Sequence, residues 1–455
     1  MGGTLDFKVR KTYYSTIVAA SIRIFNVETR VMATKKVVVL GGGYAGISAA
    51  KTLEKKFKNR PDIEIQMIER NTYHTLLTEL HEVAGGRVSP ASVRIGLNRL
   101  FKTDKVQIIQ DKIDNIDFND QLLYSANGSY PYDYLVIATG SRPFFFGLQG
   151  IETLGFKLWS YKEAVVVRDH IYDCFHNAST VTNREKRKKM LSFVVAGGGF
   201  TGVEMAGELG EWKNKLCKQF SIDREEVSIY LLEALPNILN IFDPDLANKC
   251  KKRLEKLGVQ VLTQCGIERV DKDGIYLNTK KKIEGTLIWT AGIQGNPYLE
   301  NMDIKYDRRF RVEVNEFMQS VQHENVFCAG DTISYLYNEK PLPQIVETAV
   351  QSGESVAENI GRLLGEKKMK PFVPNYHGVM VSVGSVYAVA KLKSIKLTGL
   401  MATGLKHMVN VHYLFGIGGL PLIFDYLNHE FTDRFVTPRL DVIHNDPLHK
   451  NVTQF

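Results

Sequence analysis

Two glycine-rich runs carry the residue types and spacing best suited to chemistry in this sequence. The first run extends from Gly41 to Gly46 and directly follows the short apolar, β-branched segment from Lys36 to Leu40. In this G-x-G-x-x-G pattern Gly41 permits a tight turn, Gly43 lets the backbone approach a pyrophosphate, and Gly46 lets a helix pack closely on a strand. A diphosphate binds at the N-terminus of such a helix. The run therefore predicts a dinucleotide site between a strand and a helix.

The same pattern occurs a second time further along the chain. The apolar segment from Phe193 to Ala196 leads into a run whose motif glycines are Gly197, Gly199 and Gly202. Because each run is a complete strand–turn–helix unit, the repetition predicts two dinucleotide ligands.

An acidic residue follows the second predicted strand of each unit. Glu69 comes after the segment 63–68, and Glu233 comes after the segment 227–232. A carboxylate at this place accepts hydrogen bonds from a ribose diol. Glu233 also repels a 2′-phosphate, and no Arg follows it immediately, so we expect the second unit to bind NADH rather than NADPH.

Two further strand ends distinguish a flavin site from a second nicotinamide site. The segment from Tyr134 to Gly140 reads as a buried strand that breaks into a glycine turn, and the segment from Val326 to Asp331 reads as a strand that ends in Gly-Asp. Together with the glycine units, these segments resemble the signatures of the two-dinucleotide-binding-domain flavoprotein disulfide reductase superfamily. The resemblance implies non-covalent FAD on the first unit and NADH on the second.

The same resemblance implies which residues contact each cofactor. The ribose of FAD would be held by Glu69 and its ribitol by Asp331, and Trp289-Thr-Ala-Gly292 would end a strand of the NADH unit. The expected FAD contacts are Gly41, Gly43, Gly46, Glu69, Arg70, Thr139, Gly140 and Asp331. The expected NADH contacts are Gly197, Gly199, Gly202, Glu233, Ala291 and Gly292.

The cysteines argue against thiol chemistry. They are Cys174, Cys217, Cys250, Cys265 and Cys328, and no two of them form a C-x-x-C pair. We therefore expect neither a redox dithiol nor a zinc ribbon, and no metal site is predicted. Cys328 is the one placed near the flavin by its position, but inside a buried strand it reads as structural.

The chain after Met32 resembles the type II NADH:quinone oxidoreductases, which are single-subunit, non-pumping NADH dehydrogenases. The more specific segments are residues 69–74, residues 203–209 and the C-terminal tail. The resemblance implies that Glu204 lies close to the nicotinamide and the flavin, where a carboxylate could orient the reduced cofactor or take part in proton transfer. The alternative is an ordinary acid at the start of a helix, favoured by the helix dipole.

One position departs from that family. In the family, a helix beside the flavin carries an Ala-Gln pair and a second Gln four residues after the first, and these line the quinone pocket. Here Val346-Glu347 replaces the pair, while Gln351 is kept. The spacing keeps both side chains on one helical face, but an ionised Glu only accepts hydrogen bonds. Beside a buried flavin, Glu347 could be protonated and donate to a quinone carbonyl, or could deliver a proton.

The C-terminal region has the pattern of a membrane-surface anchor. Residues 367–424 contain seven lysines and no Asp, Glu or Arg. Apolar residues recur there at steps of three and four: Leu397, Leu400, Met401, Leu405, Met408, Val409 and Phe415. This favours an amphipathic helix on an anionic leaflet, and the family resemblance implies that quinone arrives from the bilayer. A helix packed on its own domain, or an acidic protein partner, would also account for the pattern.

Two smaller expectations concern the same region. Lys406 is a candidate to close or gate the quinone route, and the alternative is a solvated lysine. The segment 378–389, rich in Val and Tyr, predicts an antiparallel strand that begins a small C-terminal domain. No run of about 18 apolar residues occurs, so no spanning helix is predicted.

Length and composition set the architecture that must position these residues. The chain has 455 residues, 44% hydrophobic and 24% charged, which excludes a disordered or fibrous protein and favours two or three domains. We expect an α/β fold with two Rossmann-like dinucleotide-binding domains and a small C-terminal α+β membrane-docking region. The expected divisions are an N-terminal extension at 1–34, an FAD-binding domain at 35–150 and 320–370, an NADH-binding domain at 151–319, and a membrane-associated region at 371–455.

The leading functional hypothesis is an FAD-dependent NADH:quinone oxidoreductase that passes a hydride from NADH to FAD and two electrons to a membrane quinone. The alternatives are a soluble NADH oxidase or diaphorase, and an NADH-responsive binding module. We expect a peripheral protein on the cytoplasmic face of the cell membrane, or on the mitochondrial inner membrane if the basic N-terminal segment is a transit peptide. A homodimer is expected, and a nucleic-acid partner is not.

Overall fold

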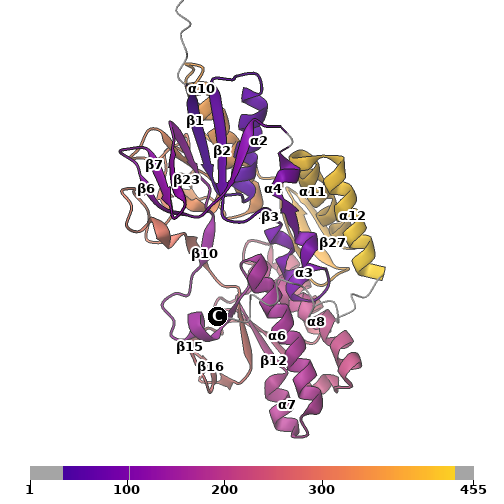
Figure 1. The fold of residues 1–455 in the computed structure, drawn as a ribbon. Coiled ribbons are helices and arrows are strands. Elements are labelled where there is room, and N and C mark those ends of the chain that lie inside the picture. Colours follow the sequence, from indigo (N-terminus) through magenta and orange to yellow (C-terminus); the bar gives the residue numbers. More distant parts are fainter. Residues whose placement is uncertain (1–33, 102, 436–455) are drawn as a thin grey trace, which may run out of the picture.

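A five-stranded parallel sheet forms the first layer of the computed structural model, which describes residues 34–101 and 103–435 (Figure 1). In sheet order its strands are β21 (Val326–Cys328), β9 (Tyr134–Ile137), β1 (Lys35–Leu40), β2 (Ile63–Glu69) and β5 (Val106–Gln110). Val37 pairs with Ile65 of β2 and with Tyr134 of β9. Val37 to Val39 are fully buried, as expected for a parallel sheet covered on both faces.

A second five-stranded parallel sheet repeats this arrangement. In sheet order its strands are β11 (Phe156–Lys157), β18 (Thr286–Trp289), β12 (Ser192–Ala196), β13 (Ser228–Leu232) and β14 (Val259–Leu262). The expected α/β fold class is therefore confirmed. Strands β10 (Ser141–Pro143) and β19 (Ile293–Gly295) pair antiparallel in the connection between the two sheets (Figure 1).

Each glycine run starts a helix directly after the central strand of its sheet. These helices are α2 (Tyr44–Phe57) and α8 (Phe200–Phe220). The first glycine of each run has a positive φ, +112° at Gly41 and +109° at Gly197, which favours glycine. A Cβ on Gly46 would lie 1.9 Å from the Gly41 carbonyl oxygen, and one on Gly202 would lie 1.8 Å from that of Gly197. Both turns therefore depend on their third glycine.

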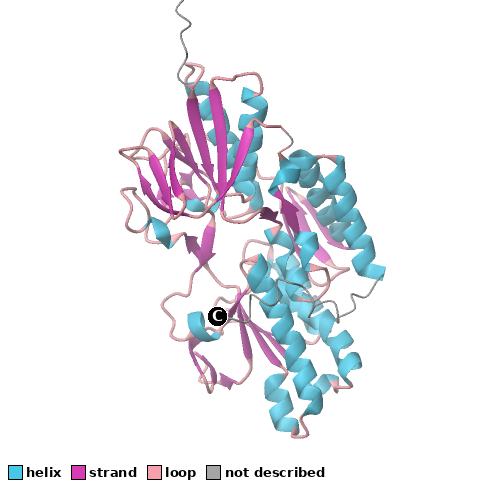
Figure 2. Ribbon diagram, in the orientation of Figure 1, coloured by secondary structure: helices cyan, strands magenta, loops and turns pink. Residues whose placement is uncertain are grey.

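The two helices have different neighbours (Figure 2). Helix α2 packs along α10 (Val346–Leu363), and the contact is close because a Cβ on Gly353 would lie 2.2 Å from the Ala45 carbonyl oxygen. Helix α8 packs instead against α3 (Leu80–Ala84), α6 (Tyr161–Thr180) and strand β25 (Val379–Ser382). Segments far apart in the sequence therefore meet around α8.

Smaller elements complete both halves of the chain. The antiparallel sheets are β6 (Ile113–Asp117), β7 (Leu122–Ser125) and β8 (Gly128–Pro131), and β15 (Ile267–Asp271), β16 (Gly274–Leu277) and β17 (Lys282–Ile283). Other elements used below are β3 (Tyr73–Thr75), η1 (Leu77–Glu79), β4 (Arg94–Gly96), α4 (Leu97–Leu100), α7 (Arg184–Met190) and α9 (Pro244–Lys256).

The C-terminal region is a three-stranded antiparallel sheet followed by two helices. After β25 come β26 (Ala388–Leu392), β27 (Ile395–Gly399), α11 (Leu400–Gly418) and α12 (Leu420–Phe435). The prediction of one strand over 378–389 is wrong. The chain turns at Gly384, where φ is +79°, and the Val383 N–H donates to the Tyr387 carbonyl, so the segment forms a hairpin.

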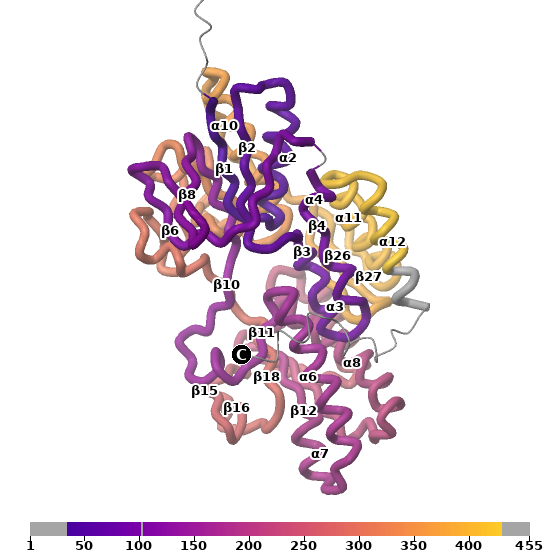
Figure 3. The backbone as a smooth tube through the Cα atoms, in the orientation of Figure 1, coloured from indigo at the N-terminus to yellow at the C-terminus, as the bar shows by residue number. Residues whose placement is uncertain are grey.

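Helices α11 and α12 lie beside the N-terminal half of the chain (Figure 3). Helix α11 contacts both α2 and α4. Among the residues that the structure describes, no helix is both long and apolar enough to cross a membrane. The predictions for residues 1–33 and 436–455, which include most of the expected N-terminal extension, lie outside the described residues.

Candidate active site

One large cavity brings most of the predicted site residues together. Its volume is about 2610 Å³, and both glycine runs, α10 and α11 contribute to its wall. The predicted residues that line it are Gly41, Gly43, Glu69, Arg70, Thr139, Gly140, Gly199, Glu204, Gly292, Asp331, Glu347, Gln351 and Lys406. The predicted residues outside its lining are Gly46, Gly197, Gly202, Glu233 and Ala291. Residues from four regions of the sequence therefore face a single space.

The residues around the first glycine run suit a bound dinucleotide. A Cβ on Gly43 would meet nothing within 4 Å, so the backbone there is open to the cavity. The buried hydroxyl of Thr139 has no hydrogen-bond partner within the described part of the chain. It is therefore available to form a hydrogen bond with a ligand. Asp331 accepts a hydrogen bond of 2.8 Å from the Ser141 hydroxyl, and burial raises the pKa of its carboxyl. FAD fits this donor and acceptor set.

Each acid after the second strand is held by its own glycine run. The Gly42 N–H donates to Glu69 and the Gly198 N–H donates to Glu233, both at 2.7 Å. The second carboxylate oxygen of Glu233 accepts from the Leu235 N–H at 2.8 Å. A Cβ on Gly199 would again meet nothing within 4 Å. The second run can therefore hold a diphosphate in the same way.

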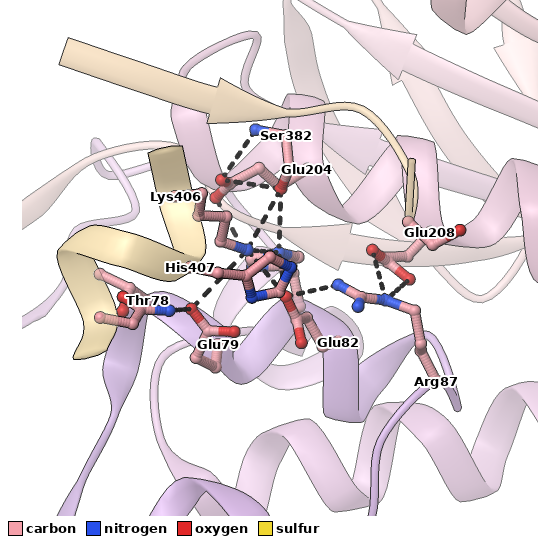
Figure 4. A network of polar contacts seen from close by, with 12 residues as sticks. Thr78, Glu79, Glu82, Arg87, Glu204, Glu208, Ser382, Lys406 and His407 are labelled. Atoms are coloured by element: carbon pink, nitrogen blue, oxygen red, sulfur yellow. Dashed lines mark hydrogen bonds and ion pairs between the residues drawn. The ribbon is translucent and has the colours of Figure 1, made fainter. Parts of the chain in front are cut away.

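Glu204 lies on the second turn of α8 at the cavity wall (Figure 4). Its carboxylate accepts from the Ser382 N–H at 3.3 Å and from the Ser382 hydroxyl at 3.2 Å, and it lies 3.5 Å from the imidazole of His81. Burial raises the pKa of Glu204 to about 7, although the positive charge of Lys406 opposes the rise. The side chain can therefore hold or release a proton near neutral pH.

Lys406 points from α11 into the protein (Figure 4). It is 8% exposed, and its Nζ donates to Glu82 at 2.7 Å and lies 3.7 Å from a carboxylate oxygen of Glu79. Burial alone would lower its pKa, but the charges of Glu79, Glu82 and Glu204 together raise it. The alternative of a solvated lysine is therefore wrong, because the ammonium group is buried among carboxylates.

Sequence reasoning missed most of the polar residues around Lys406 and Glu204. Arg87 contacts Glu82 and also donates from Nε to Glu208 at 3.0 and 3.1 Å. Burial raises the pKa of Glu208 to about 7, against the positive charge of Arg87. Glu208 lies one helical turn after Glu204, a spacing that could have revealed it. The missed residues are Glu79, His81, Glu82, Arg87, Glu208 and Ser382.

Glu347 and Gln351 hold the chain segment that enters the C-terminal sheet. The Glu347 carboxylate accepts from the His377 N–H at 3.1 Å and contacts the His377 ring. One turn later, Gln351 accepts from the Asn375 N–H at 2.9 Å and donates to the Asn375 carbonyl at 2.8 Å. The two side chains therefore share a face of α10, and His377, which sequence reasoning missed, is the partner of Glu347.

A buried histidine connects α11 to the first glycine run. Burial lowers the pKa of His74 to about 4, so its ring is neutral and carries one N–H. Its Nδ1 lies 2.9 Å from the Gly42 carbonyl oxygen, which can only accept, so Nε2 accepts from the Tyr413 hydroxyl at 3.0 Å. The position of α11 is therefore tied to the loop that would hold a diphosphate.

The apolar stripe predicted for the tail faces outward along much of α11. Leu400 and Met401 are 74% and 71% exposed, and Phe424 of α12 is 74% exposed. Two lysines of the preceding sheet form ion pairs with another part of the chain, because Lys391 pairs with Asp243 and Lys396 pairs with Asp243 and Asp245 at the start of α9. The tail therefore presents exposed apolar side chains, and part of its lysine charge is already neutralised.

Comparisons with known proteins agree with this geometry. The family described as pyridine nucleotide-disulphide oxidoreductase matches residues 35–353. The type II NADH:quinone oxidoreductase of Staphylococcus aureus is 32% identical over 396 residues, which cover 86% of this chain and 98% of that protein. NDH2 from Plasmodium falciparum in complex with NADH has a TM-score of 0.80 at 18% identity, covering 89% and 99% of the two chains. The sulfide:quinone oxidoreductase from Aquifex aeolicus has a TM-score of 0.68 at 18% identity, covering 88% and 95%.

The chain belongs to the pyridine nucleotide-disulphide oxidoreductase family, whose model matches most of it. The two parallel sheets and the two glycine runs agree with this assignment. All five cysteines are free, and Cys328 is buried in β21, where burial raises the pKa of its thiol. Within that class, the chain belongs to the type II NADH:quinone oxidoreductases.

Proposed function

We propose that this chain oxidises NADH and reduces a quinone, with FAD as its bound cofactor and without pumping protons. The observation that carries the proposal is the single cavity lined by both glycine runs, by α10 and by α11. Two dinucleotides held by these runs would extend into the same space that opens toward the C-terminal helices. The relationship to a type II NADH:quinone oxidoreductase supports the same activity.

The protein's own residues bind, orient and handle protons. FAD, when bound, supplies the redox chemistry by accepting a hydride and passing on two electrons. Gly43, Thr139 and Asp331 are proposed to bind FAD, while Gly199 and Glu233 bind NADH. Glu204 is proposed to hold a proton at the cavity wall, since its pKa of about 7 leaves it partly protonated at neutral pH.

The remaining predicted residues keep proposed roles. Arg70, Gly140, Gly41 and Gly46 are assigned to the FAD unit, and Gly197, Gly202, Ala291 and Gly292 to the NADH unit. Glu347 and Gln351 are assigned to the acceptor side of the cavity, where they hold segment 375–377. We also propose three domains: an FAD-binding domain at 35–150 and 320–370, an NADH-binding domain at 151–319, and a membrane-associated region from 371 onward.

We also propose that α11 and α12 attach the protein to the surface of an anionic membrane. The exposed Leu400, Met401, Phe415 and Phe424 support this, because a run of large exposed apolar side chains marks an interaction surface. Attachment on the cytoplasmic face and a homodimer remain part of the proposal. The membrane would supply a lipid quinone directly to the cavity.

Rapid-mixing flavin absorbance tests the function. The holoprotein is reduced with one equivalent of NADH in the absence of oxygen and then mixed with a ubiquinone or menaquinone analogue in detergent. We expect reoxidation by the quinone to be at least about a hundredfold faster than in air-saturated buffer, as for a physiological acceptor. Reoxidation by quinone no faster than by oxygen would favour an NADH oxidase instead and would overturn the proposal.

A further inference from the structure

The polar cluster around Lys406 contains more acids than bases. Within the described residues, the buried carboxyl groups of Glu79, Glu82 and Glu208 and the partly buried carboxyl of Glu204 surround the cations Lys406 and Arg87. Charges buried away from water must be compensated, so an excess of carboxylates holds protons instead of remaining ionised. Two cations can balance two carboxylates, and the cluster therefore stores protons on the others.

Glu79 occupies a distinct place in this cluster. It ends η1, is 3% exposed and lines the large cavity together with Lys406 and Asn410 of α11. The Asn410 side-chain amide donates to its Oε1 at 2.8 Å, while Lys406 Nζ lies 3.7 Å away and bonds Glu82 instead. Lys406 and Arg87 thus compensate Glu82 directly, and Glu79 has a neutral amide as its nearest donor.

Glu79 and Glu82 also reach a second, smaller cavity. This cavity has a volume of about 10 Å³, close to the smallest that holds one water molecule, and it is lined by Tyr426 and His429 of α12. His429 is partly exposed. Glu79 therefore lies between the large cavity and a small space that also borders Tyr426 and His429 of α12.

The overall reaction requires one proton from the protein in each turnover. NADH, a proton and a quinone give NAD⁺ and a quinol: the two electrons and one hydrogen come from NADH, and the second hydrogen is taken up as a proton. We propose that Glu79 donates this proton to the quinone oxygen and is reprotonated from the α12 side through the small cavity beside His429. The inference rests on the proposed function, and it adds the residue that supplies the proton.

The surroundings of Glu79 favour its protonated form. Burial raises its pKa well above the ordinary value, and the charge of Glu82 raises it further, while Lys406 and Asn410 oppose the rise. The titratable groups that face Glu79 from the neighbouring elements are Glu82 of α3, Lys406 of α11, Tyr44 of α2, and Tyr426 and His429 of α12. The burial of Glu79 and the nearby charge of Glu82 therefore favour a protonated Glu79 carboxyl.

Infrared spectroscopy tests the proton on Glu79 without any turnover. The oxidised holoprotein is examined at a pH well above the value of about 7 at which Glu204 and Glu208 titrate. We expect a carbonyl band of a protonated carboxyl that shifts in D₂O and is lost in Glu79→Gln. The same band in the variant, or no such band in the native protein, would overturn the proposal.

Half-reaction kinetics test the transfer. In Glu79→Gln, flavin reduction by NADH should keep its native rate, because that step needs no proton from Glu79. Reoxidation by a quinone analogue should slow by about a hundredfold, the usual contribution of a positioned acid, and should lose its solvent isotope effect. Glu79→Asp should restore part of the rate, which a merely structural role would not predict.

Two controls separate the possible failures. Glu255→Gln makes the same side-chain substitution on the exposed side of α9 and should leave both half-reactions unchanged. His429→Gln should leave the rate of the first turnover unchanged and slow the later turnovers, because the reprotonation of Glu79 is impaired. If quinone reoxidises the flavin of the native protein no faster than air does, the proposed function is wrong. If quinone reoxidises the native protein rapidly and Glu79→Gln at the same rate at every pH, only the proposed role of Glu79 is wrong.

Discussion

The two dinucleotide units have nearly the same backbone but carry different side chains on their helices. Two residues after the third motif glycine, α2 has Ser48 and α8 has Glu204, and four residues further they have Thr52 and Glu208. Both helices begin after a glycine with φ close to −77° and have the same acid-to-glycine hydrogen bond of 2.7 Å. The loop geometry is therefore common to both units, and the chemistry depends on what packs against each helix.

The neighbours of the two helices explain this difference. Close contact with α10 leaves α2 little room, and the small residue Ala45 lies at the point of contact. Helix α8 faces α3 and the C-terminal sheet, whose neighbourhood supplies Arg87 and Lys406 as partners for carboxylates. Buried acids are tolerated only where such partners exist. A duplicated binding unit can thus acquire proton chemistry from elements outside the repeat.

Substitution of the third motif glycine should weaken the binding of one cofactor at a time, depending on which unit carries the substitution. An alanine Cβ would clash with a backbone carbonyl at 1.9 Å in Gly46→Ala and at 1.8 Å in Gly202→Ala, and such overpacking costs about 1–3 kcal/mol. We expect Gly46→Ala to bind FAD at least about tenfold more weakly and Gly202→Ala to keep its flavin but raise the KM for NADH about tenfold or more.

Flavin absorbance after purification and NADH titration measure these effects. Gly404→Ala is the matched control, because its Cβ would meet nothing within 4 Å and its backbone is helical, so neither quantity should change. Equal loss of flavin in Gly46→Ala and Gly202→Ala would contradict the assignment of FAD to the first unit and NADH to the second.

The pH dependence of turnover should come from the second unit. Glu204 has a pKa of about 7, so it is mostly protonated below that pH and mostly ionised above it. A step in which the protonated carboxyl donates a hydrogen bond to the reduced nicotinamide slows as the pH rises through about 7. Glu204→Gln should remove this inflection, because an amide donates at every pH. Ser48→Ala, at the equivalent place in the first unit, should keep the native profile. An inflection that persists in Glu204→Gln would rule this assignment out.

The smallest expected effect concerns the choice of nicotinamide. Removing the negative charge of Glu233 in Glu233→Gln should raise the kcat/KM for NADPH relative to NADH by about tenfold, a change of about 1.4 kcal/mol. Glu69→Gln makes the same change in the first unit and should leave this ratio unaltered. A shift in both variants would mean that the two glycine runs do not hold different ligands.

The sequence was sufficient to predict features that depend on local spacing. Both glycine turns, the acids at the ends of β2 and β13, and the α/β fold class follow from patterns within about 30 residues, because strand, turn and helix are contiguous in such a unit. Glu208 could have been added from its helical spacing to Glu204. The role of Cys328 as a buried structural residue agrees with its position in β21.

Features that depend on convergence of distant segments were not predictable in this way. Glu79, Glu82 and Arg87 meet Lys406 only because α11 folds back on the N-terminal half of the chain, more than 300 residues away in sequence. The hairpin at Gly384 was read as one strand, since its turn lies within a run of β-branched residues. The lysine-rich tail suggested free surface charge, whereas three of its seven lysines form ion pairs within the chain, and Lys406 is buried.

The ion pairs of Lys391, Lys396 and Lys406 within the chain affect how the protein should be released from the membrane to which we propose it attaches. Each lysine whose charge is already compensated by a carboxylate forgoes about 1 kcal/mol of attraction to anionic lipid, whereas each large apolar side chain that enters the bilayer interface contributes about 1.5–3 kcal/mol. Salt at about 1 M shortens the screening length to about 3 Å and weakens only the first contribution. Washing with concentrated salt should therefore leave the protein in the membrane fraction, and detergent should be needed to extract it.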